Sequence, residues 1–314
     1  MQKQEFDVLA VGDGCLDVIL TGLDGSLYQK DIHHGSCQHV IAGGGFTTPV
    51  VLQRLGAKVT WAVDFGNDMI SQYIMGSARD EGVDLSFSKQ SSREIKRISV
   101  SMSNKVNRSF LSFEDKNPFF PAAFFGLLKA KAKAVYMPGT RLDWMFIVGA
   151  SIARMRKLKI IVDGNGSEKY HIGKNFVKSC LKLIDILLLN SDEAKSLSGT
   201  SYTEDALLLL SKHCRLVVLK DGANGALVLE GGKVKRISAI PVTAVDTTGA
   251  GDSFNAGFMA GWLKGLPIAE CVAWANITAG LSTTKPGGAT MKVNLANILL
   301  MMKELPQFQE GNRE

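Results

Sequence analysis

The sequence has little of what marks secreted, membrane and nucleic-acid-binding proteins. Its five cysteines are an odd number, lie far apart and form no CxxC pair, which predicts reduced, mostly buried thiols in a cytoplasmic protein. The longest strongly apolar stretches, such as Ile186–Leu189, are far shorter than a membrane span. No basic run resembles a nucleic-acid-binding arm, and Met1–Asp7 lacks the apolar region and cleavage site of a signal peptide. We therefore expect neither a membrane nor a nucleic acid as partner.

The composition also excludes a disordered or collagen-like chain. The 314 residues are 46% hydrophobic and 21% charged, an ordinary balance for a globular protein. This length allows one large or two medium domains, with a core that needs no disulfide or metal to be stable. The formal net charge is +6, and this mild, scattered excess favours an anionic ligand over a cationic one. Since no repeat, low-complexity tract or linker divides the chain, we predict a single α/β domain over residues 1–314.

The N-terminal third mixes strand and helix signals. Strands are predicted over Phe6–Val11 and Lys58–Asp64, and Val18–Leu20 is extended rather than helical. One helical pattern follows three consecutive glycines and ends at Gly56, and a second runs over Met69–Glu81.

A different pattern begins near residue 95. Ile98, Val100 and Met102 alternate with serines, and a polar turn at Asn104–Asn107 precedes a second apolar segment. Alternation with a period of two and one polar face predicts an antiparallel hairpin that is only half buried. We expect segments of about 18–41 and 95–115 to form a small β excursion from the main domain.

From Ala134 onward short apolar strands alternate with helices. Continuous apolar strands are buried on both faces, as in a parallel sheet with a helical layer on each side. The predicted strands are Val135–Met137, Ile160–Asp163, Ile186–Asn190 and Leu216–Leu219, a hairpin follows over Ala226–Ile237, and the helices of the last third are Ala250–Leu263, Ile268–Thr283 and Leu295–Lys303. The fold class is therefore α/β, with three layers around a mostly parallel central sheet.

The strongest chemical signal is the string DTTGAGDSFNAG over Asp246–Gly257, which follows a strand-like segment and opens a helix. Gly249, Ala250 and Gly251 place bare backbone amides at a helix N-terminus, where the helix dipole also favours an anion. A carboxylate at Asp252 would repel that anion, but it suits a group that removes a proton from a hydroxyl attacking a phosphoryl group. Taken alone, Asp252 fits a helix-capping role equally well.

Several motifs in the expected order make the chain resemble the ribokinase-like (PfkB) family of carbohydrate and nucleoside kinases. The Asp246–Gly257 string is similar to that family's C-terminal signature. The other matching segments are Gly43-Gly44-Gly45, Leu55–Val59, Gly66-Asn67-Asp68, Glu81–Asp84, Asn190–Glu193 and Lys220–Gly225. Because the resemblance extends over nearly the whole chain, it implies the ribokinase-like three-layer sandwich with a small β lid.

The resemblance implies roles for the residues around the late helix. Asp252 matches the family's catalytic base, and Gly249, Ala250 and Gly251 match the anion hole that stabilises charge on the transferred phosphoryl group. Asp246 resembles the residue at the family's monovalent-cation site, where K⁺ would bind. From the sequence pattern alone, Asp246 is as well explained by a turn.

The resemblance also implies a nucleotide site. Asn190 and Glu193 match residues that organise Mg²⁺ and the ATP phosphates through water, although Glu193 by itself is typical of a solvated acid at a helix start. Lys220 and Gly222 match the strand end near the nucleotide, for which a plain surface turn is the alternative. Asn276 falls on the helix that flanks adenine in the family.

At the acceptor end, Asp17 aligns with the family carboxylate that accepts hydrogen bonds from sugar hydroxyls, and a turn aspartate is the alternative. Gly43 and Gly44 resemble the di-glycine against which the substrate packs. Two positions depart from the family pattern, because Thr47 or Thr48 stands where many members have asparagine and Cys15 stands where asparagine or serine is common. Both departures put ribose in doubt as the acceptor, and we take Thr48 as the acceptor-contacting residue.

The resemblance implies an ATP-dependent kinase that phosphorylates a hydroxymethyl group of a small sugar, with ATP and Mg²⁺ as the nucleotide and metal. The hairpin near residues 95–114 fits the family lid, which closes over the substrate and supports a homodimer in some members. A kinase for adenosine-like nucleosides and a sugar-sensing protein without catalysis are the alternatives.

Other classes fit less well. Gly12-x-Gly14 follows a strand as in a dinucleotide-binding fold, but Asp17 occupies the third glycine position and the chain then stays extended. No GxxxxGK[ST] motif is present, which argues against a P-loop nucleoside triphosphatase. His33, His34, Cys37 and His39 cluster, but no second ligand pair follows at zinc spacing, so a polar loop is the better interpretation.

Overall fold

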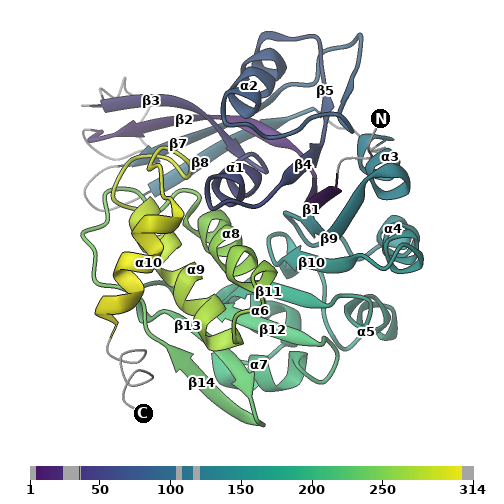
Figure 1. Ribbon diagram of the computed structural model, residues 1–314, viewed down its shortest axis with the longest axis vertical. Coiled ribbons are helices and arrows are strands. Elements are labelled where there is room, and N and C mark those ends of the chain that lie inside the picture. The colour runs from purple at the N-terminus through teal and green to yellow at the C-terminus, as the bar shows by residue number, and fades with distance from the viewer. Residues whose placement is uncertain (1–4, 24–34, 36, 104–107, 116–120, 306–314) are drawn as a thin grey trace.

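The computed structural model describes residues 5–23, 35, 37–103, 108–115 and 121–305. Strands and helices alternate along most of these residues (Figure 1). The strands are β1 (Glu5–Val11), β2 (Gly14–Thr21), β3 (Cys37–Gly44), β4 (Val59–Ala62), β5 (Asp64–Phe65), β6 (Lys89–Gln90), β7 (Arg97–Ser103), β8 (Arg108–Glu114), β9 (Lys131–Met137), β10 (Lys159–Asp163), β11 (Ile186–Asn190), β12 (Leu216–Lys220), β13 (Ala226–Glu230) and β14 (Lys233–Ile237). The helices are α1 (Thr47–Arg54), α2 (Met69–Asp80), α3 (Pro121–Lys129), α4 (Trp144–Met155), α5 (Asn175–Leu181), α6 (Ser191–Ser198), α7 (Thr203–Leu210), α8 (Ala250–Leu263), α9 (Ile268–Ser282) and α10 (Leu295–Glu304).

The central sheet is 8-stranded, in the order β14-β13-β12-β11-β10-β9-β1-β4. Its strands from β12 to β4 pair in parallel, and the β13–β14 hairpin adds an antiparallel edge. The predicted hairpin over Ala226–Ile237 and the predicted mostly parallel sheet are therefore confirmed. Parallel strands joined through helices bring their carboxyl ends to one edge of the sheet, where such folds bind ligands.

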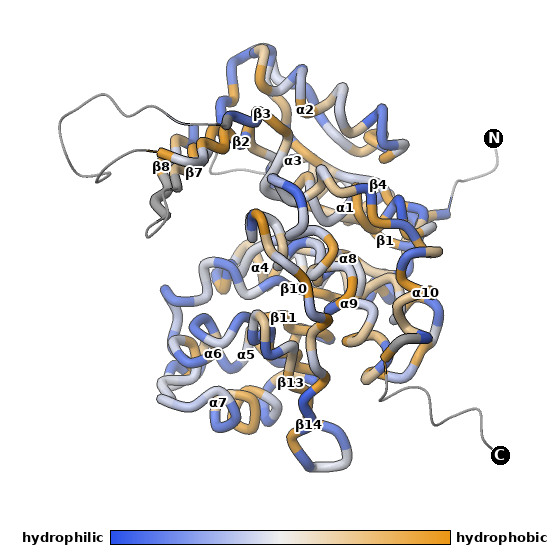
Figure 2. Tube along the Cα trace, turned by 90° about the vertical axis from the view of Figure 1, so that its left-hand side faces the viewer, coloured by the Kyte–Doolittle hydropathy of each residue, from blue (hydrophilic) through white to orange (hydrophobic). Residues whose placement is uncertain are grey.

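Alternating side chains of each central strand enter two separate cores. In β1, Val8 and Ala10 belong to the core beneath α1, α8 and α9, whereas Leu9 and Val11 belong to the core beneath α3 to α7. Because both faces are covered, the strands consist of continuous apolar residues, and Figure 2 shows the α5–α7 layer with mixed hydrophilic and hydrophobic residues, as amphipathic surface helices have. The predicted three-layer α/β fold is confirmed.

A second sheet, in the order β3-β2-β7-β8, extends to the side of the central sheet (Figure 1). It includes the predicted hairpin of β7 and β8, whose turn at Asn104–Asn107 lies outside the described residues. Its inner face carries Asp17 and packs through Ile41 against Gly287. Its outer face carries apolar side chains, of which Leu111 and Phe113 are more than half exposed.

The predicted strand over Lys58–Asp64 is shorter in the structure. β4 ends at Ala62, and Asp64 and Phe65 then pair with β6 as a separate two-stranded sheet. The Val63 amide donates to the Ser88 hydroxyl at 3.2 Å, so the chain bends away from β1 at this point. A short apolar run cannot by itself show which of two neighbouring strands it will pair with.

The cysteines and the helices bear on the predicted reduced thiols and the expected absence of a membrane span. Cys180, Cys214 and Cys271 are buried free thiols, and Cys15 is a partly buried one. Within the described ranges, none of the helices combines the length and the apolar character that crossing a membrane would require.

Candidate active site

Polar side chains meet at the carboxyl edge of the central sheet. Tyr136 lies near the end of β9, and Asp163, Asn190 and Lys220 end β10, β11 and β12. The N-terminal part of α8 lies across the ends of these strands, and one of its side chains, Asn255, hydrogen-bonds to three of these four residues. The sequence pattern alone predicted the strands, and the sheet order now places their last residues side by side.

The N-terminus of α8 is a tight turn that only glycine can form. Gly249 has a φ of 68°, and a Cβ added there would lie 2.5 Å from the Cα of Gly288. The Ala250 amide donates to a carbonyl of the preceding turn at 3.2 Å. The amides of Gly251 and Asp252 come next in the first helical turn, where no carbonyl of the same helix can accept from them. They therefore remain suited to an anion.

Asp252 lies in a buried environment beside α1. The Thr48 hydroxyl is 3.2 Å from the Asp252 carbonyl oxygen and 3.3 Å from its Oδ1. Burial raises the pKa of the Asp252 carboxyl to about 7, the negative charge of Asp163 adds to the increase, and Lys220 and the Thr48 hydrogen bond oppose it. A carboxyl with this pKa can accept and release a proton near neutral pH.

A buried hydrogen-bond network links Asp252 to the strand ends. Asn255, one helical turn after Asp252, donates to the Tyr136 hydroxyl at 3.0 Å and also to Asp163. The Tyr136 hydroxyl lies 3.2 Å from the Thr48 hydroxyl. Since burial raises the pKa of Tyr136 well above its usual value, its hydroxyl stays protonated and can donate to Thr48 while accepting from Asn255. Such a satisfied network holds the Asp252 side chain in one position.

Lys220 extends this network toward the end of β12. Its ammonium group lies 3.2 Å from Asp163 Oδ2 and 3.4 Å from Asn255 Oδ1. Its side chain is only 12% exposed, so the positive charge is held beside the first turn of α8 rather than in solvent. A Cβ added at Gly251 would lie 3.6 Å from Lys220 Nζ, which shows how closely the lysine approaches this turn.

A cavity of about 520 Å³ opens on the β12–β13 side of Asp252. The predicted nucleotide residues Lys220, Gly222 and Asn276 line it together with Ala250 and Gly251. The Asn276 side-chain amide donates to the carbonyls of residues 237 and 238 at 2.9 and 3.0 Å, so it also holds the end of β14 against α9. The cavity is large enough for a nucleotide and is lined mainly by aliphatic groups away from the lysine.

Asn190 and Glu193 form a reciprocal cap at the start of α6. The Asn190 side chain accepts from the Glu193 amide at 2.8 Å, and the Glu193 carboxylate accepts from the Asn190 amide at 2.8 Å. Burial raises the pKa of Glu193, and Asp163 contributes to the increase while Lys220 opposes it. Glu193 therefore faces the same strand ends as the network. Its hydrogen bond to the Asn190 amide also makes it a helix-start acid, the alternative that the sequence pattern allowed.

The Asp246 carboxylate accepts hydrogen bonds from the turn that this residue begins. Its Oδ1 accepts from the amide and the hydroxyl of Thr248 at 3.0 and 2.7 Å, and its Oδ2 accepts from the Gly287 amide at 2.8 Å. These bonds connect the loop before α8 to the loop after α9. They are the bonds expected from the turn interpretation of this residue.

Asp17 lies on the inner face of the second sheet and is buried. The Cys15 thiol donates to Asp17 Oδ1 at 3.0 Å. A Cβ added at Gly43 would lie 1.8 Å from Asp17 Oδ2, so a glycine is required for the carboxylate to take this position. Gly44 has a φ of 60° and approaches the Cys15 sulfur. The di-glycine thus makes space for the carboxylate, and the charge of Asp17 also reaches Asp252, whose pKa it raises.

Thr48, the predicted acceptor-contacting residue, lies beside Asp252. Its hydroxyl hydrogen-bonds to Asp252 and lies beside the hydroxyl of Tyr136, and its contact with the acceptor stays a prediction. Thr48 is fully buried in the first turn of α1. Its position therefore depends on the packing of α1 against α8, which the sequence motif does not show.

Sequence reasoning missed Asp163, Tyr136 and Asn255 as members of the site. One signal was available, because Asp163 is a charged residue at the end of a predicted apolar parallel strand, which is where ligands bind in such sheets. Asn255 stands within the quoted glycine-rich string but was given no role. Tyr136 gives no sequence signal, since a tyrosine within an apolar strand is also typical of a core.

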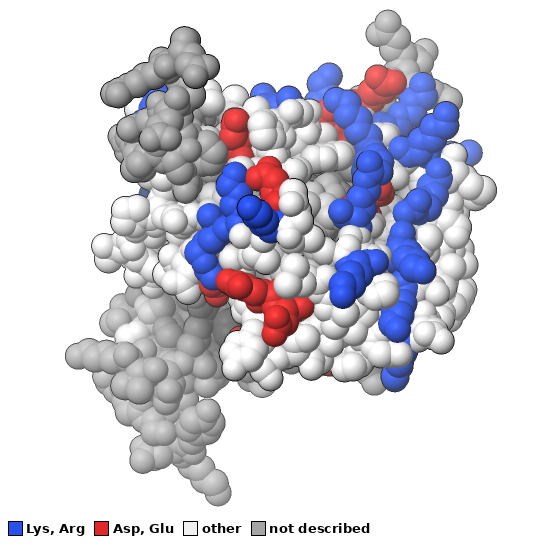
Figure 3. Space-filling model, turned by 90° about the horizontal axis from the view of Figure 1, so that it is seen from below, with Lys and Arg blue, Asp and Glu red and all other residues white. Residues whose placement is uncertain are grey.

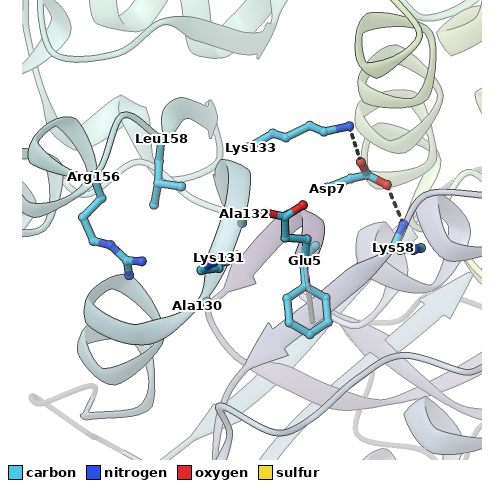
Figure 4. Close-up of a pocket in the computed structure, with 10 residues that line it drawn as sticks. Glu5, Asp7, Lys58, Ala130, Lys131, Ala132, Lys133, Arg156 and Leu158 are labelled. Atoms are coloured by element: carbon cyan, nitrogen blue, oxygen red, sulfur yellow. Dashed lines mark hydrogen bonds and ion pairs between the residues drawn. The ribbon is translucent and has the colours of Figure 1, made fainter. Parts of the chain in front are cut away.

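The opposite edge of the sheet has a different character. A hollow of about 470 Å³ lies there between the amino ends of β1 and β9, and Lys133 pairs with Asp7 at its rim at 2.7 Å (Figure 4). On another face, Lys and Arg side chains form a band with fewer acids around it (Figure 3). The hollow is far along the strands from Asp252 and does not contain the residues of the network.

The cluster considered as a zinc site lies mostly outside the described residues, because His33 and His34 and the side chain of Cys37 are not described. Among the side chains that the structure describes, no group of three or more His, Cys, Asp and Glu could hold a metal ion.

The chain matches the profile of the pfkB family carbohydrate kinases over residues 6–294, and it therefore belongs to this family. It is 25% identical over 278 residues to the ATP-dependent 6-phosphofructokinase of Thermoanaerobacterium thermosaccharolyticum, and the match covers 84% of each chain. It is 26% identical over 307 residues to the aminoimidazole riboside kinase of Salmonella typhimurium, covering 90% of this chain and 91% of that one. The structure of Arabidopsis thaliana ribokinase complexed with ribose and ATP has a TM-score of 0.78 and 20% identity, and the match covers 96% of this chain and 99% of that chain.

Family and fold together define the class of the protein. It is a phosphotransferase with a hydroxyl group as acceptor, a kinase of the PfkB family with the ribokinase fold. The relatives act on different acceptors according to their names, so membership of the family does not identify the acceptor of this chain.

Proposed function

We propose that the protein transfers the γ-phosphoryl group of ATP to a hydroxymethyl group of a small sugar. The observation that supports this most directly is the position of Asp252, whose pKa is raised to about 7 at the N-terminus of α8. The 520 Å³ cavity lies on one side of this carboxyl, and the charge of Asp17 reaches it from the other. A base between a nucleotide cavity and a hydroxyl-binding carboxylate is the arrangement that phosphoryl transfer to an alcohol requires.

In the proposed reaction the acceptor O–H hydrogen-bonds to the ionised Asp252 carboxylate. The proton moves to Asp252 as the acceptor oxygen forms a bond to the γ-phosphorus, and the bond between that phosphorus and the bridging oxygen of ADP breaks. ADP leaves with the electron pair of that bond, and Asp252 later releases its proton to solvent. The raised pKa makes the carboxylate a better base than an exposed aspartate, while it still ionises near neutral pH.

The N-terminus of α8 provides the electrostatic part of the proposal. The amides of Gly251 and Asp252 and the positive end of the helix dipole stabilise negative charge on the migrating phosphoryl group. Gly249 and Ala250 shape the turn that aims these amides. Lys220, held by Asp163 at 3.2 Å, adds a fixed positive charge beside the same turn.

Asp163 at the end of β10 and Glu193 in the first turn of α6 fit a magnesium ion that keeps most of its water. Mg²⁺ in kinases is usually held by one or two carboxylates and by phosphate oxygens. Asp163 and Glu193 are close enough for Asp163 to raise the pKa of Glu193, which is the acid pair such an ion needs. When bound, the ion would neutralise charge on the nucleotide phosphates, and Glu193 with Asn190 would hold its water shell.

Asp17 and the second sheet complete the proposed acceptor site. An ionised, buried carboxylate can accept hydrogen bonds from two neighbouring sugar hydroxyls. The second sheet carries Asp17 on its inner face and can cover the acceptor as a lid, which would exclude water and so suppress hydrolysis of ATP.

An ADP-release assay with ATP and a panel of sugars and nucleosides tests the function. We expect turnover with at least one acceptor that carries a free hydroxymethyl group, and we expect Asp17→Asn to raise the KM for that acceptor by about 10- to 100-fold. The KM for ATP should stay within about twofold. Acceptor binding by calorimetry without any ADP release would instead indicate a sugar-sensing protein, and it would contradict the proposal.

The pH dependence of kcat/KM tests Asp252 as the base. Because only the ionised form accepts a proton, activity should fall about tenfold per pH unit below the Asp252 pKa and level off above it. The Asp163→Asn variant removes a charge that raises this pKa, so its acidic limb should shift to lower pH. An acidic limb that stays at the same pH in Asp163→Asn would argue against Asp252 as the titrating group.

We further propose that two copies associate through the outer face of the second sheet. Leu111 is 65% exposed and Phe113 is 55% exposed on this face, an apolar surface that pairing would cover. Leu111→Glu should convert a dimer to a monomer in sedimentation equilibrium. Leu208→Glu on α7, where the leucine is 41% exposed, should not. A single mass shared by the wild type and both variants would exclude this interface.

A further inference from the structure

The central sheet and the second sheet are joined at Asp13, where the chain leaves the central sheet. β1 ends at Val11 and β2 begins the second sheet at Gly14, so Gly12 and Asp13 form the crossing. Gly12 has a φ of 113°, and a Cβ added there would lie 2.5 Å from a side-chain carbon of Pro138. The crossing is therefore a closely packed turn that leaves little room for another path of the backbone.

Asp13 also holds a second crossing between the sheets, where β3 leads into α1. Its carbonyl oxygen accepts a hydrogen bond from the Gly45 amide at 2.9 Å. A Cβ added at Gly45 would lie 2.5 Å from that oxygen, so the third glycine of the Gly43-Gly44-Gly45 motif allows this close approach. The backbone of Asp13 thus ties the two crossings together.

The Asp13 carboxylate reaches a further strand of the second sheet. Arg97 is the first residue of β7, and its Nη2 lies 3.1 Å from Asp13 Oδ2. Its Nε lies 3.6 Å from the carboxylate of Glu114 on β8, the residue opposite Arg97 in the β7–β8 register. One guanidinium group therefore links the crossing at Asp13 to both strands of the β7–β8 hairpin.

The Arg97 guanidinium is held in place by charge. The Arg97 side chain is 8% exposed and that of Asp13 is 17% exposed, whereas Glu114 is 68% exposed and its ion pair is screened by solvent. Among the described residues, Nε and Nη2 of Arg97 have no hydrogen-bond partner. A buried ion pair is screened little, and removing one partner leaves the other charge uncompensated. We therefore expect β7 to stay beside Asp13 only while both charges are present.

The position of β7 bears on Asp17, the proposed acceptor carboxylate. β7 pairs in parallel with β2, and Ser99, two residues after Arg97, lies opposite Asp17. Residues opposite one another, and residues two apart along a strand, share one face of a sheet, so Arg97 lies on the inner face with Asp17. Burial raises the pKa of the Cys15 thiol that bonds to Asp17, and the charge of Arg97 opposes the increase. The guanidinium therefore lies near the acceptor carboxylate as well as at the crossing.

We propose that Arg97 is a positioning residue that holds the second sheet against Asp13. Held in this way, β2 keeps the Asp17 carboxylate near enough for its charge to reach Asp252. The inference rests on the proposed function, because Asp17 has to bind the acceptor for its position to matter. Without the charge of Arg97, the second sheet loses one connection to the central sheet, the acceptor is held less well at Asp252, and water can reach the phosphoryl group.

The Arg97→Met variant removes the charge and keeps a long side chain. With the best acceptor of the sugar and nucleoside panel, we expect its KM for that acceptor to rise about tenfold, and ADP release from ATP without any acceptor to rise at least about threefold. The KM for ATP should stay within about twofold. Arg97→Lys keeps the positive charge and should restore both quantities to within about threefold of the wild type.

Two further measurements test the partner and the connection directly. In a double-mutant cycle, adding Arg97→Met to Asp13→Asn should raise the acceptor KM by less than about twofold beyond Asp13→Asn alone. Hydrogen–deuterium exchange needs no substrate. Backbone amides of β7 and β8 should exchange faster in Arg97→Met than in the wild type, and those of β10, β11 and β12 should exchange at the wild-type rate.

Arg54→Met is the matched control. Arg54 on α1 pairs with Glu81 at 2.6 Å and has a side chain that is 12% exposed, but this pair joins α1 to the end of α2 and lies at neither crossing. The control should lower the melting temperature, as Arg97→Met does, because each leaves a partly buried acid without its partner. It should leave the acceptor KM and the acceptor-free ADP release within about twofold of the wild type.

The outcomes separate this inference from the proposed function. Wild-type exchange of β7 and β8 in Arg97→Met would overturn the inference and leave the kinase function in place. An equal rise of the acceptor KM in Arg54→Met and Arg97→Met would also overturn it, since the effect would then come from lost stability. Failure of the wild type to phosphorylate any sugar or nucleoside would overturn the proposed function, and the inference with it.

Discussion

Replacing Asp252 with asparagine is expected to lower kcat by about 10³-fold, because an amide cannot take the acceptor proton. The Kd for ATP should stay within about twofold, since the base acts mainly in the transition state. Stopped-time ADP assays and calorimetric titration with ATP measure the two quantities. An equal loss of ATP affinity would contradict the prediction and mark Asp252 as a structural residue.

The same substitution should not weaken the fold. The Asp252 pKa is raised from 3.8 to about 7 in the folded protein, so the folded protein holds the proton more tightly than the unfolded chain. Ionised Asp252 therefore lowers the free energy of unfolding as the pH rises above 3.8, and the deficit is complete above about 7. Asp252→Asn removes this deficit, so we expect its melting temperature at pH 8 to rise.

Asp205 offers a matched control for both measurements. It is also an aspartate in the first turn of a helix, α7, but it is exposed to solvent. Asp205→Asn removes the same charge near a helix N-terminus without touching the active site. Turnover should be unchanged in this variant. A comparable loss of kcat would show that the effect at Asp252 comes from helix stability and not from proton transfer.

The second large effect is expected for Gly249→Ala. Gly249 has a φ of 68°, and its added Cβ would meet the Cα of Gly288 at 2.5 Å. The turn must therefore shift, and the amides of α8 would no longer point at the phosphoryl group. We expect kcat to fall about 10²-fold, the loss typical of removing one donor from such an anion hole.

Gly265→Ala separates backbone strain from displacement of the turn. Gly265, just after α8, has a φ of 77° but no atom within 4 Å of an added Cβ. Both substitutions cost about 1–2 kcal/mol of left-handed strain, so both should lower the melting temperature. Only Gly249→Ala should lower kcat strongly. Equal kcat values for the two variants would refute the role of the turn.

Much of the architecture could be predicted because it is encoded locally. α8 spans Ala250–Leu263 as predicted, and the β13–β14 hairpin lies within the predicted segment. Apolar periodicity, glycine at turns and the parallel-strand pattern are properties of neighbouring residues. The predicted strand end at Asp64 was wrong because β4 and β5 belong to different sheets, a choice made by residues far along the chain.

The candidate site was predicted where short sequence motifs contain its residues. The residues of the α8 turn are contiguous in the sequence, so their pattern could be read directly. The bond from Asn255 to Tyr136 spans 119 residues, and the bond from Asn255 to Asp163 spans 92. The spacing of residues in one sequence does not show that such distant positions are in contact, and the tyrosine could equally have been a core residue.

By itself the sequence determined the class of fold, the glycine turn before α8 and the acid in the first turn of α8, because these follow from short-range sterics and hydrogen bonding. Only the tertiary structure decided that Thr48 faces that acid, that Lys220 and Asp163 surround it, and that Arg97 meets Asp13 where the two sheets join. The physical reason is that burial and Coulomb interaction depend on distance in space. A carboxyl of ordinary acidity in the unfolded chain becomes a base for neutral pH only when the fold removes its water and brings other charges beside it.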